Sequence, residues 1–346
     1  MLADEPTLQK INDFLWYGYL PIKSDTLIEK VFDDRDYCIS YKKRLSEKTP
    51  DQLVKEGAEI LQRAFDRHLA SVKGEQVIPL SGGLDSRLIL AHLLEAGLKK
   101  EIVAVTFGTP GTLDYEIPKK VARVAGVSHH SYDLTKIPIS ESNLINTAKK
   151  RKVWIELVTV FYLDEFKMNF DNSPAIWIGF LGDPIGGSHY KAGYQTLDWG
   201  RAKQEFVRFN RWCSALHPSL CQNGYIPSNS LPTLSIIDNP DLISYPDQLD
   251  FGIRQGTWLK AALDCSAPNV ITPFLDFDWI RFMLLVPEPY RVNSNLYHKI
   301  MLFRFPKLFG IETKSISTGY LKKSASENVL VRLVTRLHRK SSLFSY

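Results

Sequence analysis

The sequence predicts an α/β fold built on a doubly wound parallel sheet. Residues 77–80 form a short apolar run that leads into a glycine turn, and residues 102–107 form a second run after a helical stretch. A third run, residues 175–180, also ends in glycines. Short apolar runs that alternate with helical patterns are typical of strands buried on both faces of a parallel sheet.

The helices between these strands are predicted from apolar periodicity. One helix begins near Arg87 and ends before Gly97, and residues 114–125 are expected to form another. Residues 127–132 are expected to form a shorter strand, and the chain beyond Tyr190 is expected to be mostly helical with proline breaks. A helix that starts at Pro50 precedes all of these elements. Its apolar residues recur at helical spacing: Leu53, Val54, Ala58, Leu61, Phe65 and Leu69.

The length and composition are those of a protein with a full hydrophobic core. The chain has 346 residues, of which 44% are hydrophobic and 23% charged. This length suits one large domain, or one domain with a smaller attachment. Residues 1–6 lack the features of a signal peptide, and no apolar run is long enough to cross a bilayer. We therefore expect a cytoplasmic protein.

The cysteines and paired histidines indicate no zinc site. His129 and His130 are adjacent, so in a strand they would point to opposite faces, and we expect structural roles for them. The cysteines are expected to be free thiols, because no Cys-x-x-Cys pair occurs among Cys38, Cys213, Cys221 and Cys265.

The net charge of +5 is concentrated in residues 321–346. This tail has six basic residues and one acidic residue, whereas the rest of the chain has equal numbers of each. Such a tail is expected either to pack on the core or to make weak contact with an anionic membrane surface. It is predicted to be a basic amphipathic helix because apolar residues recur at helical spacing: Val329, Leu330, Leu333, Val334 and Leu337.

The motif Ser-Gly-Gly-Leu-Asp-Ser, residues 81–86, predicts a phosphate-binding loop. It lies between a strand and a helix, so backbone N–H groups and the positive helix end face the same point. A carboxylate beside phosphates is best explained as a ligand of Mg²⁺, and this role is assigned to Asp85. The loop is not a Walker loop, because no Gly-x-x-x-x-Gly-Lys-Ser/Thr string occurs.

A second glycine turn, which contains Asp183, follows the strand at residues 175–180. In a doubly wound sheet, ligands bind beyond the carboxyl ends of the strands. We therefore expect the loops at Ser81 and Asp183 to face one nucleotide. The residues at neighbouring strand ends that are candidates to contact its adenosine are Leu80, Val105 and Thr106.

In this order, the motifs resemble the synthetase domain of glutamine-dependent asparagine synthetases, within the N-type ATP pyrophosphatase superfamily. The resemblance covers nearly the whole chain and implies a sheet of the adenine nucleotide alpha hydrolase type with a helical C-terminal part. It further implies a linker-like leader (residues 1–45), a synthetase domain (46–320) and the basic tail (321–346). Four segments carry it: residues 81–86, 107–130, 179–190, and Thr272-Pro273-Phe274-Leu275-Asp276 followed by Lys299.

The resemblance also implies a reaction and a set of site residues. Enzymes of this family use ATP and Mg²⁺ to convert a carboxylate to an acyl-adenylate, release pyrophosphate and then form an amide. Asp85 and Asp183 match the magnesium ligands, and Lys299 matches a lysine that stabilises charge in the reaction. The implied nucleotide-binding residues are Leu80, Ser81, Gly82, Gly83, Leu84, Asp85, Ser86, Val105, Thr106 and Gly179.

Three departures from the family pattern bear on the substrates. Pro184 stands where an acidic residue is usual, and Phe303 stands where arginine is common, with Arg304 displaced by one. Leu2 stands where a glutaminase domain would present its cysteine. We therefore expect nitrogen from free ammonia, a separate glutaminase or a substrate amine. The acid is expected to be a small molecule or a peptide.

Two other functions are compatible with the same loop. A nucleotide-binding subunit without chemistry is favoured by Pro184 and Phe303, but the presence of Asp85, Asp183 and Lys299 argues against it. A transfer-RNA-modifying enzyme would usually need paired or catalytic cysteines. The electrically neutral body also offers little affinity for nucleic acid, so no nucleic-acid partner is expected.

Overall fold

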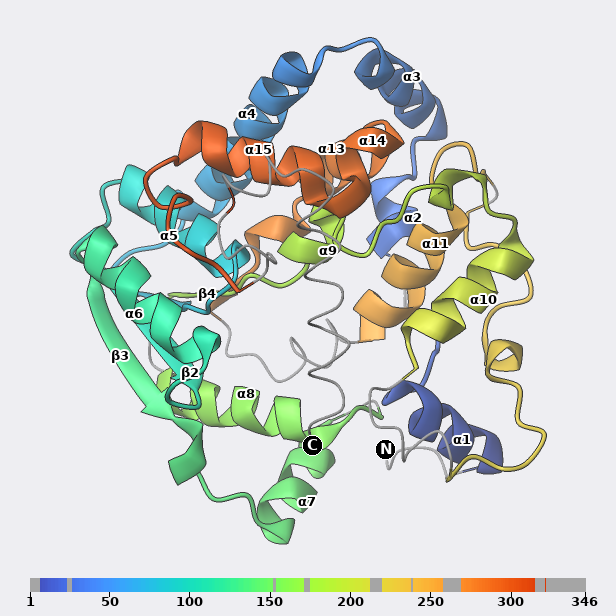
Figure 1. Ribbon diagram of the computed structural model, residues 1–346, viewed down its shortest axis with the longest axis horizontal. Coiled ribbons are helices and arrows are strands. Elements are labelled where there is room, and N and C mark those ends of the chain that lie inside the picture. Colours follow the sequence, from blue (N-terminus) through green and yellow to red (C-terminus); the bar gives the residue numbers. More distant parts are fainter. Residues whose placement is uncertain are drawn as a thin grey trace, which may run out of the picture.

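The structure is a computed structural model that describes residues 7–23, 27–151, 154–170, 175–211, 220–237, 239–257, 269–314 and 321 (Figure 1). Apart from Leu321, the predicted basic tail lies outside these residues, as do Cys213 and Cys265. The two described cysteines, Cys38 and Cys221, form no disulfide.

Five parallel strands form the sheet, in the order β3-β2-β1-β4-β5. In the centre, Gln76 is paired with Ile102 on one side and with Ala175 on the other. The chain moves outward from β1 through β2 to β3, and then returns to add β4 and β5 on the opposite side. This arrangement confirms the predicted doubly wound sheet. The strands are β1 (Gln76–Pro79), β2 (Ile102–Gly108), β3 (Ser128–Asp133), β4 (Ala175–Trp177) and β5 (Val270–Ile271).

Helices lie on both sides of the strands. In Figure 1, α4 (Pro50–Leu69), α13 (Phe277–Leu285) and α15 (Asn295–Arg304) lie at the top of the view, and α8 (Leu157–Phe170) lies at the bottom. The strand-to-strand connections contain α5 (Asp85–Glu95), α6 (Leu113–Ala125) and α7 (Glu141–Lys150). The main core between the sheet and the upper helices includes Phe65, Leu88, Trp177, Phe274, Trp279 and Phe282.

A smaller group of helices lies at the right of Figure 1 and has its own hydrophobic cluster. It consists of α1 (Leu8–Tyr17), α10 (Trp199–Phe209) and α11 (Tyr245–Leu249). A π-helical turn, Asp250–Arg254, continues α11. The residues buried in this cluster are Tyr17, Tyr19, Ala202, Phe206, Leu231, Leu249 and Ile253.

The predicted leader contributes more to the core than its sequence indicates. Its helices α2 (Leu27–Val31) and α3 (Arg35–Ser46) bury several side chains in the main core. Because α2 spans only five residues, it is too short to show a helical period. The buried side chains of this part are Ile28, Val31, Phe32, Cys38, Tyr41 and Leu45.

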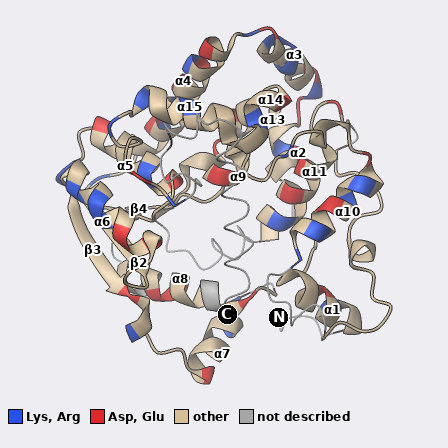
Figure 2. Cartoon of the chain, in the orientation of Figure 1, with Lys and Arg blue, Asp and Glu red and all other residues tan. Residues whose placement is uncertain are grey.

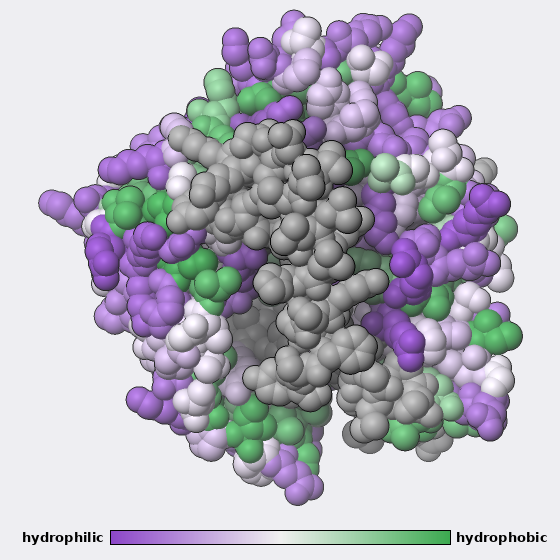
Figure 3. Space-filling view, viewed as in Figure 1, coloured by the Kyte–Doolittle hydropathy of each residue, from purple (hydrophilic) through white to green (hydrophobic). Residues whose placement is uncertain are grey.

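The surface of the described part is mixed in charge. Acidic and basic residues are interspersed over the helices in Figure 2, and hydrophilic residues dominate the upper edge in Figure 3, with small separate hydrophobic patches. Among the described residues, no helix has the length and apolar character needed to cross a membrane.

Candidate active site

The two glycine turns meet at the point where the strand order reverses, beyond the carboxyl ends of β1 and β4. The backbone N–H of Asp183, in α9 (Gly182–Gly186), donates to Asp85 Oδ2 at 3.0 Å. A Cβ at Gly182 would lie 2.6 Å from Asp85 Cγ, and one at Gly179 would lie 2.9 Å from Asp85 Cβ. Only glycine permits this close approach, so both glycines serve to bring the two aspartates together.

Asp85 has a perturbed acidity because of its surroundings. The Tyr297 hydroxyl, from α15, donates to Asp85 Oδ1 at 2.8 Å, and Tyr297 is itself buried. Burial, followed by the charge of Asp183, raises the pKa of Asp85 to about 7, while the hydrogen bonds from Tyr297 and the Asp183 N–H oppose this rise. Asp85 therefore titrates near neutral pH in the ligand-free protein.

The two aspartates fit a magnesium ion that arrives with a nucleotide. Each oxygen of Asp85 accepts one internal hydrogen bond and keeps a further lone pair, and Asp183 is exposed. Across the described ranges, no group of three or more His, Cys, Asp or Glu could form a metal cage. Magnesium is commonly held by one or two carboxylates together with phosphates and water, so the pair is sufficient.

The N–H groups of the phosphate loop donate to side chains of the loop itself and of α6. Ser81 N–H donates to Ser86 Oγ at 3.1 Å, and Gly83 N–H donates to Ser81 Oγ at 3.2 Å. Gly82 N–H donates to Asp114 Oδ1, from α6, at 3.2 Å. The sequence predicts these groups as donors to phosphate, so a phosphate would exchange with these internal acceptors. The start of α5 has no side-chain cap, which leaves its positive end facing the same region.

The residues predicted to contact adenosine are brought together but are buried. Leu80 N–H donates to Val105 O at 2.7 Å, and the Thr106 hydroxyl donates to Leu80 O at 2.8 Å. Thr106 Oγ1 also lies 2.9 Å from His129 Nε2. These side chains build the strand ends, and their contact with adenosine stays a prediction. The structural role expected of His129 stays a prediction.

On α15, the structure brings Tyr297 and His298 toward the aspartates. Burial lowers the pKa of His298 to about 4, whereas the charge of Asp183 acts in the opposite direction. Lys299 is exposed and lies about 200° around the helix from Tyr297. Within the described part of the chain, Lys299 forms no hydrogen bond or ion pair with either aspartate, so its catalytic role stays a prediction.

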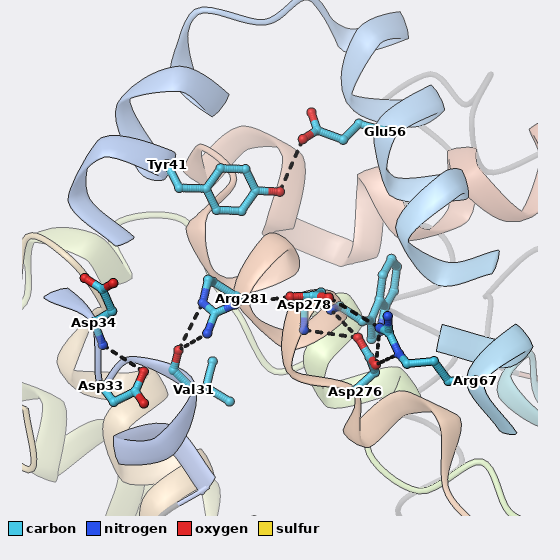
Figure 4. A network of polar contacts seen from close by, with 10 residues as sticks. Val31, Asp33, Asp34, Tyr41, Glu56, Arg67, Asp276, Asp278 and Arg281 are labelled. Carbon is cyan, nitrogen blue, oxygen red and sulfur yellow. Dashed lines mark hydrogen bonds and ion pairs between the residues drawn. The ribbon is translucent and has the colours of Figure 1, made fainter. Parts of the chain in front are cut away.

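Two residues near the other family segments have structural roles. Arg304 donates to Gln62 Oε1 at 2.6 Å and pairs with Glu95, so it joins α15 to α4 and α5. Asp276, which ends the Pro-Phe-Leu-Asp segment, caps α13 and accepts a hydrogen bond from Arg67 Nε at 2.8 Å (Figure 4). Phe303, at the position where the family commonly has arginine, is exposed.

A cavity adjoins the second turn, between α9, α10 and α11. Its wall contains Pro184 and a hydrogen-bonded pair in which His189 Nδ1 lies 2.8 Å from Asp250 Oδ2. Asp250 belongs to the π-helical turn, a type of distortion that is frequent at functional sites. The remaining wall is mixed. It includes four aromatic residues and three polar or charged ones: Tyr190, Tyr194, Phe206, Phe209, Glu205, Asn210 and Asp247.

Replacing Tyr297 should change the acidity of Asp85. We expect Tyr297→Phe to raise the pKa of Asp85 further. The hydrogen bond from the Tyr297 hydroxyl stabilises the ionised carboxylate, and the substitution removes it. Carboxyl carbon NMR of the metal-free protein, titrated between pH 4 and 9, would measure it. Tyr290→Phe, in α14 (Glu288–Arg291), is the control and should leave the titration unchanged. An unshifted Asp85 titration in Tyr297→Phe would contradict the expectation.

Comparison with known proteins agrees with part of the resemblance. Residues 56–148 match the model of the asparagine synthase family, and this segment contains the phosphate loop and Asp114. The resemblance to that family is confirmed over this segment.

Among solved structures, an NH3-dependent NAD synthetase from Campylobacter jejuni is similar at 13% identity, with a TM-score of 0.25. The alignment covers 42% of this chain and 62% of that chain. No curated protein matches the chain.

Proposed function

We propose that this protein is an ATP-dependent carboxylate–amine ligase that forms an acyl-adenylate and then an amide, with release of AMP and pyrophosphate. The observation that carries the proposal is the contact between Asp85 and Asp183 at the switch point of the sheet, beside the phosphate loop. The family match over residues 56–148 supports the coarser part of the proposal, an ATP-utilising ligase.

The chain's own residues divide the work of the first step. The loop of residues 81–86 and the uncapped start of α5 stabilise the negative charge that develops on pyrophosphate as it leaves. Magnesium, held by Asp85 and Asp183 when bound, neutralises phosphate charge. Tyr297 orients the Asp85 carboxylate through its 2.8 Å hydrogen bond. Lys299 has the role that the resemblance implies, provided that its side chain turns toward the nucleotide.

The cavity beside Pro184 is the proposed place for the acid or the amine. It begins one residue after Asp183, so a group bound there would lie next to the nucleotide phosphates. Its aromatic side chains would contact an apolar part of the substrate, and the His189–Asp250 pair offers hydrogen-bonding groups for a polar part. Pro184 stands in the cavity wall where the family usually has an acidic residue, so it removes a negative charge there. This change favours a substrate different from aspartate.

The products of ATP cleavage test the reaction class. We expect the purified protein, given ATP, Mg²⁺ and a panel of small and peptide carboxylates with ammonia or amines, to release AMP and pyrophosphate with its correct acid. Anion-exchange chromatography of the nucleotides would distinguish these products from ADP and phosphate. The Asp85→Asn variant, prepared in parallel, controls for contaminating ATPases. Formation of ADP by the wild-type protein, but not by the Asp85→Asn variant, would contradict the adenylation mechanism.

A nucleotide-binding subunit without chemistry is the second candidate. The inward hydrogen bonds of the phosphate loop and the exposed Lys299 are the observations that favour it. This candidate predicts binding of Mg·ATP without cleavage for every acid in the panel.

A further inference from the structure

A lysine ammonium lies against the cavity between α9, α10 and α11. Lys191 follows α9 in the chain, and its Nζ lies 3.4 Å from Glu205 Oε2. The same Nζ lies 5.5 Å from the centre of the Tyr194 ring and 5.7 Å from that of the Phe209 ring, within the range of a cation–π contact. One carboxylate and two aromatic rings therefore surround this ammonium. We call these three residues, Tyr194, Glu205 and Phe209, the cage.

The cage opens into the cavity. All three of its residues line the cavity, whereas Lys191 is not among the described residues of the wall. The Lys191 side chain is 43% exposed, and exposed ion pairs contribute little to stability. The ammonium of a ligand in the cavity can therefore replace that of Lys191 without the loss of a strong internal contact.

The surroundings of the cage favour a positive charge. Arg208 donates to both oxygens of Glu205, from Nε to Oε1 at 3.2 Å and from Nη2 to Oε2 at 2.6 Å, and so fixes the orientation of the carboxylate. The hydrogen bond from Arg208 also lowers the pKa of Glu205, which is therefore ionised at neutral pH. Phe209 ends α10, where the negative end of the helix dipole favours a cation.

Acidic groups outnumber basic ones among the described residues of the cavity wall. His189 is the one basic residue there. The acidic residues are Glu205, Asp247 and Asp250. A carboxylate bound in the cage would face the Glu205 carboxylate and the negative faces of two aromatic rings. The cage therefore selects against the acid substrate and in favour of the amine.

Two arginines near the cavity do not reverse this preference. Arg291 binds the two oxygens of Asp247 at 2.6 and 2.8 Å, and Arg254 Cζ lies 5.6 Å from the centre of the Phe209 ring. Neither arginine is among the described residues of the wall. Because a ligand ammonium would replace that of Lys191, the number of positive charges around Phe209 would stay the same.

We propose that the cage binds an alkylammonium group of the amine substrate, in the place that Lys191 occupies in the ligand-free protein. This inference rests on the proposed function, because it names a substrate class for the proposed ligase. An ammonium held by Glu205 keeps its proton and cannot attack a carbonyl, so a second amino group of the same molecule would react. The substrate class is therefore an alkyl diamine.

The second amino group has room on the other side of the cavity. The cage contains no residue of α9, so a diamine held there leaves the side of Pro184, next to Asp183, for the reacting nitrogen. That nitrogen, as the neutral amine, would form the C–N bond to the acyl-adenylate. The C–O bond to AMP would break, and the nitrogen would release one proton to solvent.

Binding of small probes to the full chain in the absence of ATP tests the cage. We expect 1,4-diaminobutane and 1-butylammonium to bind at pH 7.5, and butyrate to bind at least roughly 10-fold more weakly. Glu205→Gln should weaken the binding of 1,4-diaminobutane at least roughly 10-fold, because the charge-assisted contact is lost. Phe209→Leu should weaken it about threefold, whereas Tyr194→Phe keeps an aromatic ring and should change it less than about twofold. Ligand-observed NMR titrations would measure each affinity.

Two lysine and arginine variants test whether Lys191 competes with the ligand. Lys191→Met should tighten the binding of 1,4-diaminobutane about two- to fivefold, because the competing ammonium is removed. Arg201→Met removes one positive charge from an exposed position of α10 and is the matched control, which should leave binding unchanged. Thermal unfolding of each variant establishes that it is folded.

The outcomes separate this inference from the proposed function. Unchanged binding in Glu205→Gln, or equal affinity for butyrate and 1-butylammonium, would overturn the cage as an ammonium site. Equal effects of Lys191→Met and Arg201→Met would overturn the competition by Lys191, since only net charge would then matter. A wild-type protein that binds 1,4-diaminobutane but forms no AMP with any acid would contradict the proposed function and leave the cage in place. Formation of AMP by a protein that binds no alkylammonium would overturn the cage alone.

Discussion

Asp85→Asn is expected to lower ATP turnover at least about 100-fold, because the substitution removes a preorganised charge at the site where phosphate charge develops. The same loss is expected for Asp183→Asn, since the two aspartates lie in contact. Steady-state pyrophosphate release, with the acid found by screening, would measure both. Asp36→Asn, an exposed acid in the first turn of α3, is the control and should retain wild-type turnover.

Although Asp85→Asn is expected to lower turnover, it should raise the stability of the metal-free protein relative to wild type as the pH increases. The folded-state pKa of Asp85 is raised from 3.8 to about 7. Its contribution to stability is therefore present below about pH 4 and is lost as the pH rises through 7. Relative to Asp85→Asn, the metal-free wild-type protein should lose roughly 1–3 kcal/mol of unfolding free energy between pH 4 and 8, after allowance for partial solvent exposure.

Urea unfolding in the presence of EDTA at several pH values would measure this difference. A parallel pH dependence of the two proteins would show that Asp85 has an ordinary acidity. If Asp85→Asn reduces turnover but does not change the pH dependence of the unfolding free energy, the role of Asp85 in the reaction stands and only its raised pKa is contradicted.

Arg87→Met is expected to be the most destabilising single change near the loop. It leaves the carbonyls of Leu308, Ile311 and Glu312 without their charged donor, and such contacts contribute about 1.5–3 kcal/mol each. Because the losses are not additive, we expect a total of about 3 kcal/mol or more. Burial lowers the pKa of Arg87 to about 10, so the guanidinium is still charged at neutral pH.

Chemical denaturation at pH 7.5 would measure this loss, with Arg63→Met on the exposed face of α4 as the control, for which a change within about 0.5 kcal/mol is expected. The Arg87→Met protein that remains folded should also bind pyrophosphate more weakly. Arg87 holds residues 308–312, and the Thr313 hydroxyl and the Lys314 N–H that follow donate to Gly82 O of the phosphate loop. Wild-type stability in Arg87→Met would show that residues 308–314 are held by other contacts.

Local patterns predicted the sheet and the central part of the site. The strands at residues 77–80 and 102–107 were apparent because buried parallel strands are continuous apolar runs. The meeting of Asp85 and Asp183 followed from a general rule, since ligand sites in doubly wound sheets form beyond the carboxyl ends of strands where the order reverses. The glycines of both turns indicated the close approach that the structure shows.

Other parts of the site have no local signature. β5 has only two residues, too few to show a period, and the contacts of Tyr297 with Asp85 and of Lys314 with Asp114 join positions 200 or more residues apart. Hydrogen bonding between distant segments depends on how whole helices pack, which no short window of sequence records.

The sequence by itself therefore determined the sheet apart from β5, together with the phosphate loop and the two aspartates, because strand burial and glycine turns are local properties of the chain. Only the tertiary structure decided which side chains surround them. The rotation of α15 shows why: burial of Leu296, Ile300 and Met301 in the core sets its orientation. That orientation directs Tyr297 to Asp85 and leaves Lys299 exposed, so core packing, and not the motif, selects the residue that contacts the aspartate.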